Sequence, residues 1–189
     1  MLFRSWGDKK DEFVRPVQWA VLLFDGKVCN DLILGVTASD KSRGHRFHAN
    51  TEIAIKSPQS YEQQLRDAFV IADFETRKQI ISDGVHSLAK QINGHAQVDA
   101  DLLDEVAALN EWPVPLMGKF DSHFLSVPAE ALISSMKEHQ KYFHLVDDNQ
   151  KLLPAFITVA NIESKDPSQV IDGNERVIRP RLADAAFFY

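Results

Sequence analysis

The 189-residue sequence predicts an α+β fold, in which a mainly antiparallel sheet is combined with a helical segment. Apolar runs typical of strands occur towards both ends of the chain, and a long stretch with helical spacing separates them. Short sequences of turn residues, of the length found in hairpins, connect consecutive strand-like runs, so neighbouring strands are expected to be antiparallel. A hydrophobic content of 44% and a charged content of 25% are typical of a globular chain that buries a core.

Residues 1–60 are expected to form the first part of the sheet. Two apolar runs flank Asp25-Gly26, a dipeptide typical of tight turns. The run from Val28 to Val36 is rich in branched residues and predicts a strand, whereas the run from Pro16 to Phe24 fits either a strand or a short helix with proline in its first turn. Glu52 to Lys56 alternates polar and apolar residues as a half-buried strand does, and Ser57-Pro58 ends it.

Residues 61–112 are expected to form an acidic helical segment. Tyr61 to Asn93 has helical spacing, with Asp73 placed to cap the second of two helices and Gly94 placed where that helix ends. Asp101 to Leu109 repeats the pattern. The segment holds 10 acids and 4 bases, while the rest of the chain holds 17 of each, so the net charge of -6 belongs to this segment. A basic surface elsewhere is therefore compatible with the acidic total.

Residues 113–189 are expected to form one compact unit with residues 1–60. The prolines of Trp112 to Leu116 end the helical segment, because they remove backbone donors. A helix is predicted from Val127 to about Glu138, followed by a hairpin of Tyr142 to Val146 and Leu152 to Ala160 around a polar turn. Ser168 to Tyr189 has helical stretches crossed by a proline.

The sequence lacks the residues and motifs that several classes of chemistry require. Cys29 is its only cysteine, which excludes an internal disulfide and favours a reducing, cytoplasmic setting. No apolar run approaches the roughly 20 residues of a membrane-spanning helix, so no membrane partner is expected. The chain has no glycine-rich phosphate loop and no nucleophile elbow, and His45 and His48 lack a third ligand at suitable spacing. We therefore expect no catalytic residue and no metal site in these residues.

Basic residues with interleaved aromatics are the remaining feature with functional chemistry. Arginine forks suit phosphate, and aromatic faces suit stacking on bases. The alternative is structural: Arg176 with Glu175 and Arg181 with Asp184 make surface ion pairs, and Phe47 belongs to the core. The candidate contact residues form three clusters: Lys41, Arg43, His45, Arg46 and His48; Lys137, His139, Gln140 and Lys141; and Arg176, Arg179 and Arg181.

The stretch Ser42 to Ala49 (SRGHRFHA) is the most purely basic turn of the chain. We expect it to be a loop after a strand, with Gly44 making the turn and Phe47 anchoring it. Arg43 and Arg46 are then available for phosphate or for a neighbouring domain.

A set of short motifs resembles, in order and over nearly the whole chain, the beta subunit of bacterial glycyl-tRNA synthetase. The motifs are Trp6-Gly7, Phe13-Val14-Arg15-Pro16-Val17, Arg43 to Ala49, Val70-Ile71-Ala72-Asp73-Phe74-Glu75, Glu111-Trp112-Pro113-Val114-Pro115, Val127-Pro128-Ala129-Glu130, His139-Gln140-Lys141-Tyr142-Phe143, Asn161 to Pro167 and Gly173 to Ala185.

The resemblance implies a subunit of an enzyme rather than an independent catalyst. In that family the beta chain is several times longer, so this sequence is expected to be an internal fragment that ends before the HD-like and anticodon-binding modules. The family enzyme has two alpha and two beta chains. The alpha chain makes glycyl-adenylate from glycine and ATP with Mg²⁺, and the beta chain is needed for tRNA binding. The implied partners are the alpha subunit, the remainder of the beta chain and glycine tRNA, with no cofactor in this fragment.

The covered region also resembles the mixed α/β editing module of the phenylalanyl-tRNA synthetase beta chain. No residue here matches the editing residues, and glycine leaves little that is smaller to reject by size. The expected role is therefore to bind tRNA or to organise the complex. The alternatives are a structural docking module without tRNA contact and a vestigial editing-like domain.

Overall fold

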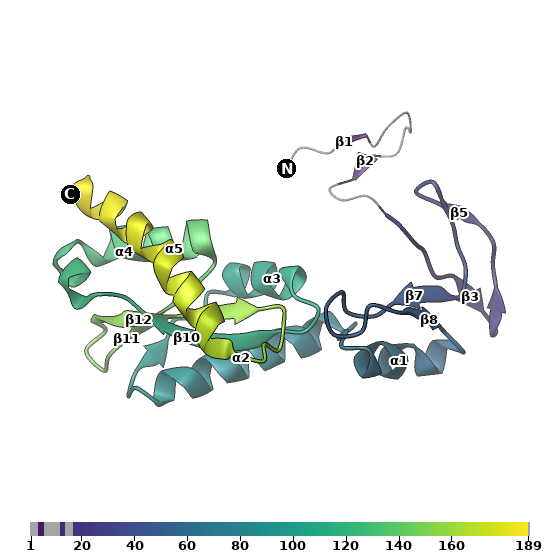
Figure 1. The fold of residues 1–189 in the computed structure, drawn as a ribbon, viewed down its shortest axis with the longest axis horizontal. Coiled ribbons are helices and arrows are strands. Elements are labelled where there is room, and N and C mark those ends of the chain that lie inside the picture. Colours follow the sequence, from purple (N-terminus) through teal and green to yellow (C-terminus); the bar gives the residue numbers. More distant parts are fainter. Residues whose placement is uncertain (1–3, 6–11, 14–16, 189) are drawn as a thin grey trace. The chain divides into compact units, whose positions relative to one another are not determined.

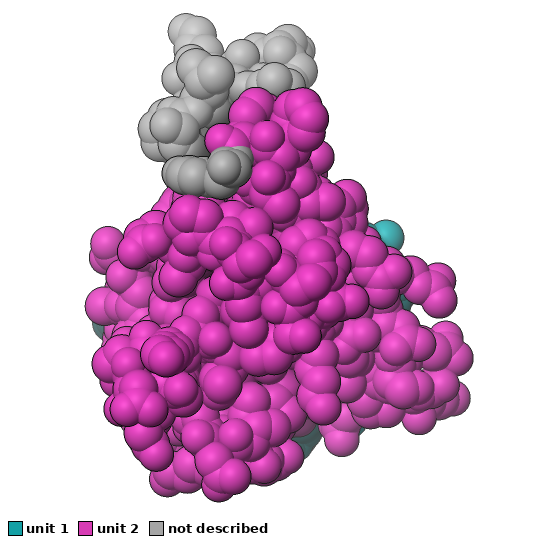
Figure 2. Space-filling view, turned by 90° about the vertical axis from the view of Figure 1, so that its left-hand side faces the viewer, with its two compact units in different colours: residues 1–72 teal, residues 73–189 magenta. Residues whose placement is uncertain are grey.

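The computed structural model describes residues 4–5, 12–13 and 17–188, and it divides into two compact units, residues 1–72 and residues 73–189 (Figure 2). Helices and antiparallel strand pairs occur together, which confirms the predicted α+β class. The resemblance to the phenylalanyl editing module stays a prediction. Each unit is described by itself.

Unit 1, residues 1–72, is built from short hairpins and a helix. Antiparallel pairing joins the strands two by two, as β1 with β2, β3 with β4, β5 with β6 and β7 with β8, and a 3-10 turn, Pro58–Ser60, leads into the helix α1, Tyr61–Asp67. The strands are β1 (Arg4–Ser5), β2 (Glu12–Phe13), β3 (Leu23–Phe24), β4 (Lys27–Val28), β5 (Leu32–Ile33), β6 (Val36–Thr37), β7 (Lys41–Arg43) and β8 (Glu52–Ala54). The strand predicted from Glu52 and the turn at Asp25-Gly26 are confirmed, since both turn residues have positive φ.

The strand predicted over residues 28–36 is wrong. A second tight turn interrupts it, because Leu34 and Gly35 both adopt positive φ, of 47° and 77°, and fold β5 back onto β6. The short-helix alternative for residues 16–24 is also wrong for its described part, which contains β3 and no helical residue from Val17 onward; Pro16 lies outside the described residues.

Unit 2, residues 73–189, is a four-stranded antiparallel sheet in the order β10, β12, β11, β9, covered on both faces. Ile157 and Phe156 are neighbours on β12 and point into different cores, as alternating strand side chains must. Figure 1 shows α5 crossing one face of the sheet, while α2 and α3 pack on the other. The elements are α2 (Phe74–Lys90), β9 (His95–Ala96), α3 (Ala100–Leu109), β10 (Val114–Lys119), a 3-10 turn (Ser122–Ser126), α4 (Ala129–Ser134), a π-helical turn (Ser135–His139), β11 (Phe143–Val146), β12 (Leu152–Ala160) and α5 (Pro167–Phe187).

Several short-range sequence features of this unit predicted the structure correctly. Asp73 caps α2 by accepting from the Thr76 amide at 2.7 Å, as predicted, and the chain leaves the helix through Asn93, in the left-handed region, just before Gly94. Pro115 is tolerated in β10 because β10 is an edge strand. The helical stretches predicted at the C-terminal end form one helix, α5, that continues through Pro180.

The division at residues 72 and 73 differs from the boundaries at 60/61 and 112/113 suggested by composition. The acidic segment supplies α2 and α3, whose Ile81, Val85 and Val106 share one core with β11 and β12. Acidity marks the outer face of these helices, not a separate appendage.

Candidate nucleic-acid interface

The basic turn between β7 and β8 is held in shape by backbone contacts around Gly44. The Gly44 amide donates to the Thr51 carbonyl at 3.1 Å, and a Cβ added at Gly44 would lie 2.4 Å from the Ala49 carbonyl oxygen and 2.9 Å from the Ala68 side chain. Glycine is therefore required at this position by close approach of the backbone, not by a positive φ.

His45, a predicted contact residue, lies inside the turn. It is 1% exposed, and its Nδ1 accepts the backbone amides of Phe47 and His48 at 3.2 and 3.3 Å. Accepting at Nδ1 places the proton of a neutral ring on Nε2. The His45 amide also donates to the Ala68 carbonyl at 2.9 Å, which ties the turn to the end of α1. His45 thus organises the turn and offers no surface to a ligand.

The expectation that Phe47 anchors the turn is wrong, because its side chain is 72% exposed. The anchoring rings are histidines: His48 is half-buried, stacks on Phe69 with ring centroids 4.8 Å apart, and lies 4.8 Å from the His45 ring. The turn therefore buries His45, covers half of His48 and exposes its phenylalanine.

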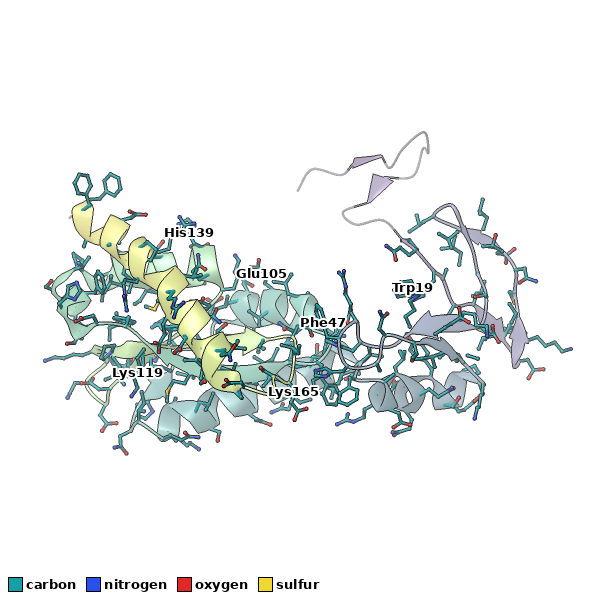
Figure 3. All side chains as sticks on the ribbon, viewed as in Figure 1. Trp19, Phe47, Glu105, Lys119, His139 and Lys165 are labelled. Carbon is teal, nitrogen blue, oxygen red and sulfur yellow. The ribbon has the colours of Figure 1, made fainter. Side chains whose placement is uncertain are left out.

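The two arginines of the turn lie on the outside, each over an aromatic ring. The Arg43 guanidinium lies 5.8 Å from the centroid of Trp19, and that of Arg46 lies 5.8 Å from the centroid of Phe47. Trp19 is 42% exposed, and both rings are labelled in Figure 3. Together these four residues, Trp19, Arg43, Arg46 and Phe47, are called the arginine–aromatic pairs below.

A shallow cavity of about 250 Å³ opens beside the first pair. Its lining is mostly polar and includes Trp19, Lys41, Arg43 and Glu52. Lys41, another predicted contact residue, forms an exposed ion pair with Glu52 across β7 and β8, at 3.5 Å. An exposed pair of this kind contributes little to stability and leaves the lysine able to exchange partners.

The second predicted cluster faces acids of α3. Lys137 lies 3.0 Å from Asp99, and Lys141 lies 2.9 Å from Glu105. The hydrogen bond that Lys137 donates to the Asp99 carboxylate raises the pKa of the lysine, which keeps the ammonium charged. His139 is exposed and Gln140 is half-buried. The positive charge of this cluster is thus largely compensated inside unit 2.

The third predicted cluster is exposed along α5 but does not form one patch. Arg176, Arg179 and Arg181 are all exposed. Because each helical residue turns by about 100°, Arg176 and Arg179 share one side of α5 while Arg181 lies on another. The pKa of Asp121 is lowered mainly by its hydrogen bonds with His123, and the charge of Arg179 adds a smaller contribution.

Trp19 was missed by sequence reasoning, which assigned it to an apolar run. Its pairing with Arg43 depends on the chain between β3 and β8 folding back, as the bond from the Ser39 amide to the Ala20 carbonyl at 2.9 Å shows. The residues around a tryptophan at the edge of a strand-like run do not show on which face of the strand its ring will lie.

Metal binding and membrane spanning find no support in the described residues. No group of three or more His, Cys, Asp or Glu side chains there is arranged to hold a metal ion. Within the same residues, no helix is both long enough and apolar enough to cross a membrane.

Comparison with known proteins gives a consistent family. The family model described as glycyl-tRNA synthetase beta subunit matches residues 3–189. A glycine–tRNA ligase beta subunit of Marinobacter nauticus is 60% identical over 186 residues, and the corresponding subunits of Hahella chejuensis and Ectopseudomonas mendocina are both 58% identical, over 185 and 184 residues.

These relatives are named as subunits of an aminoacyl-tRNA ligase. The chain belongs to the glycyl-tRNA synthetase beta subunit family. The matches cover 97% of this chain and 27% of the relatives, so the chain spans about a quarter of their length.

Proposed function

We propose that this chain is the part of a glycine–tRNA ligase beta subunit that contacts glycine tRNA, through the arginine–aromatic pairs of unit 1. The adenylate-forming reaction, with ATP and Mg²⁺, is assigned to the alpha subunit in the cytoplasm, and this chain helps to hold the tRNA for it. The observation that carries the proposal is the outward placement of both arginines over exposed rings.

The chemistry of these pairs suits RNA. A guanidinium presents a planar fork to phosphate oxygens, and an exposed aromatic face stacks on any base. Stacking of one base on an aromatic side chain contributes about 1–3 kcal/mol. An arginine already lying over its ring is preorganised, so less side-chain freedom is lost on binding.

Charge compensation separates this surface from the second basic cluster. In the described part of the chain, neither Arg43 nor Arg46 forms an ion pair, whereas Lys137 and Lys141 both do. The turn also carries no acid between Lys41 and Thr51. Across β7, the turn and β8, Lys41, Arg43 and Arg46 outnumber the one acid, Glu52, so the local charge is positive although the whole chain is acidic, and a positive local charge steers a polyanion.

A salt titration tests the proposal. Binding of glycine tRNA to the chain is measured at increasing salt, with Arg43 and Arg46 both replaced by glutamine. Each lost phosphate contact lowers the slope of log K against log salt by about 1, so we expect a shallower slope and weaker binding at low salt.

The matched control is Lys56→Gln with Arg66→Gln, which removes the same charge from exposed positions elsewhere in unit 1. The control should lose less affinity than the turn variant. Equal losses, or no binding of tRNA at low salt by the unaltered chain, would show that the turn is not a tRNA contact.

A second candidate function is docking on the alpha subunit or on the remainder of the beta chain. The observation that favours it is the apolar surface of the hairpins in unit 1, where Phe24 is 77% exposed, Leu32 75% and Leu34 42%. Exposed apolar side chains at hairpin tips are typical of protein contacts. A test that separates docking from folding is given in the Discussion.

A further inference from the structure

A second cavity, of about 260 Å³, lies in unit 2 between the end of α3, the segment before β11 and the end of β12. Its lining is mixed: three carboxamides, a hydroxyl and an ammonium contribute to it, together with three aliphatic side chains. The lining residues are Val106, Leu109, Asn110, Gln140, Lys141, Thr158, Val159 and Asn161. We call it the amide cavity; Glu105 and His139, labelled in Figure 3, mark its neighbourhood.

Two buried polar side chains of this cavity have unused hydrogen-bonding capacity. Asn110 is 6% exposed; its Nδ2 donates to the Val106 carbonyl at 2.7 Å, and within the described residues no group donates to its Oδ1. Thr158 is 8% exposed, and no hydrogen bond of its hydroxyl is found in that same part of the chain. Neither oxygen is among the fully buried unsatisfied atoms of the described residues, so both face accessible space at the cavity and are open to bonding with water or with a ligand.

The backbone beside the cavity is held in uncommon conformations. Residues Ser135–His139 form a π-helical turn, and Lys141, which follows it, has a φ of 60°. Single π-helical turns and left-handed non-glycine residues both concentrate at functional sites. The bonds from the Lys141 and Tyr142 amides to the Lys137 and Met136 carbonyls, at 3.2 and 3.0 Å, fix this geometry.

The cavity also gathers sequence motifs that are distant along the chain. Gln140 and Lys141 belong to the string that ends at Phe143, and Asn161 opens another. The Asn161 Oδ1 accepts the amides of Glu111 and Trp112, at 2.8 and 2.9 Å, which joins a third string to the same place.

We propose that the amide cavity binds an unpaired nucleobase that carries an exocyclic amino group. Asn110 Oδ1 is the acceptor for that amino group, since side-chain amides recognise the edge of such bases. The Thr158 hydroxyl and the Gln140 carboxamide supply further donors and acceptors for the ring edge. Leu109, apolar yet 51% exposed, and Val159 offer aliphatic surface to the ring.

Lys141 takes the phosphate of the same nucleotide by exchanging its partner Glu105, because a partly exposed ion pair contributes little and can be replaced. Its ammonium lies 2.9 Å from Glu105, and its side chain is 32% exposed, so it is oriented and still accessible. The base can come from a single-stranded end of an RNA or from a free nucleotide. This site is independent of the arginine–aromatic pairs, so either proposal can fail without the other.

The experiment measures equilibrium binding of AMP, CMP and UMP to the 189-residue chain, and of short single-stranded RNAs ending in C-C-A or in U-U-U. UMP is the matched probe without an exocyclic amino group. One hydrogen bond contributes about 0.5–1.5 kcal/mol, so AMP and CMP should bind about 3- to 10-fold more tightly than UMP. Tighter binding of the C-C-A RNA than of free AMP assigns the base to an RNA end, and the reverse order assigns it to a free nucleotide.

Thr158→Val is the variant to test, because valine has the same shape and suits a strand. It should weaken AMP binding about 3- to 10-fold while the unfolding midpoint is unchanged or raised. Gln140→Leu is the second variant, and Thr51→Val, at an exposed position in unit 1, is the control that leaves binding unchanged. No saturable binding by any probe, equal binding of AMP and UMP, or full affinity in both cavity variants would overturn the proposal.

Discussion

Leu34 occupies a backbone conformation that favours asparagine or glycine. Its φ of 47°, followed by 77° at Gly35, is the pattern of a two-residue hairpin turn in which both central residues have positive φ. The equivalent turn of the preceding hairpin has Asp25-Gly26, which suits that geometry. A leucine here is strained and exposes an apolar side chain, and both costs are understandable if the side chain serves a contact.

We predict that Leu34→Asn stabilises the chain by roughly 0.5–1 kcal/mol, because asparagine tolerates the left-handed region better than leucine. Chemical denaturation measures the gain. Leu32→Asn is the control: it removes an equally apolar side chain from a strand, where asparagine is unfavourable, so no gain is expected.

The same two variants test the docking function. If the hairpin tips dock on the alpha subunit, both substitutions should reduce its co-purification with the chain, although only one of them stabilises the fold. Unchanged co-purification in both variants would argue against docking through these tips.

Single residues also show where sequence reasoning failed. Gly44 was expected to make the turn, but the turn residues are Arg46 to His48, and Gly44 is required by the close approach of the backbone. Arg43 and Arg46 were expected to be available for phosphate or for a neighbouring domain, and both are exposed. The predicted burial of Phe47 and of His45 was wrong, because an aromatic ring is normally buried and a histidine is normally exposed. Here two backbone amides need an acceptor, and His45 Nδ1 supplies it, so the polar ring is the buried one.

At the scale of elements, two helical glycines allow the effect of helix propensity to be told apart from the effect of packing, because only one of them is packed against another element. Gly84 lies in α2, where an added Cβ would be 2.6 Å from Cγ of Pro115 on β10. Gly173 lies in α5, where an added Cβ would have no neighbour within 4 Å. The first glycine allows the helix to approach the sheet, and the second has no such reason in the structure.

We therefore predict opposite signs for one substitution. Gly173→Ala should raise the free energy of unfolding by up to about 1 kcal/mol through helix propensity alone. Gly84→Ala should lower it by about 1–3 kcal/mol, because overpacking at Pro115 outweighs the same gain. Urea denaturation of both variants checks this, and stabilisation by both would mean that α2 moves freely away from β10.

An element could be predicted from the sequence when the interactions that form it are close together along the chain. Asp73 caps α2 through a bond that spans three residues, and α3 shows its helical spacing within ten residues, so both helices were predicted from sequence. The short strands β5 and β6 depend on a turn with an unusual residue, and they were missed. The unit boundary depends on α2 packing against β10 and β12, a non-local contact that composition does not encode.

At the scale of the whole molecule, aspartates begin four of the helical elements. Each accepts hydrogen bonds from the first turn, and these bonds lower the pKa of the carboxyl below its ordinary value of 3.8. The residues are Asp73, Asp99, Asp121 and Asp166, bonded to the amides of Thr76, Leu102, His123 and Ser168.

The lowered pKa values make stability depend on pH in a defined direction. Because the folded carboxyl has the lower pKa, the unfolded chain binds more protons in the range between the two pKa values. The stabilisation is therefore complete well above pH 3.8, and it is lost as the pH falls through that value towards the folded pKa. We predict that the free energy of unfolding declines below about pH 5.

Asparagine tests this mechanism, because it caps helices as well as aspartate does and does not titrate. Asp73→Asn with Asp166→Asn should make the acid decline shallower, since two of the groups that take up protons on unfolding are gone. Asp172→Asn with Asp184→Asn, at exposed positions of α5, removes the same charge from residues that cap nothing. Denaturation midpoints at several pH values between 3 and 7 measure both slopes. An equal flattening by the two pairs would show that total charge, and not the caps, governs acid stability.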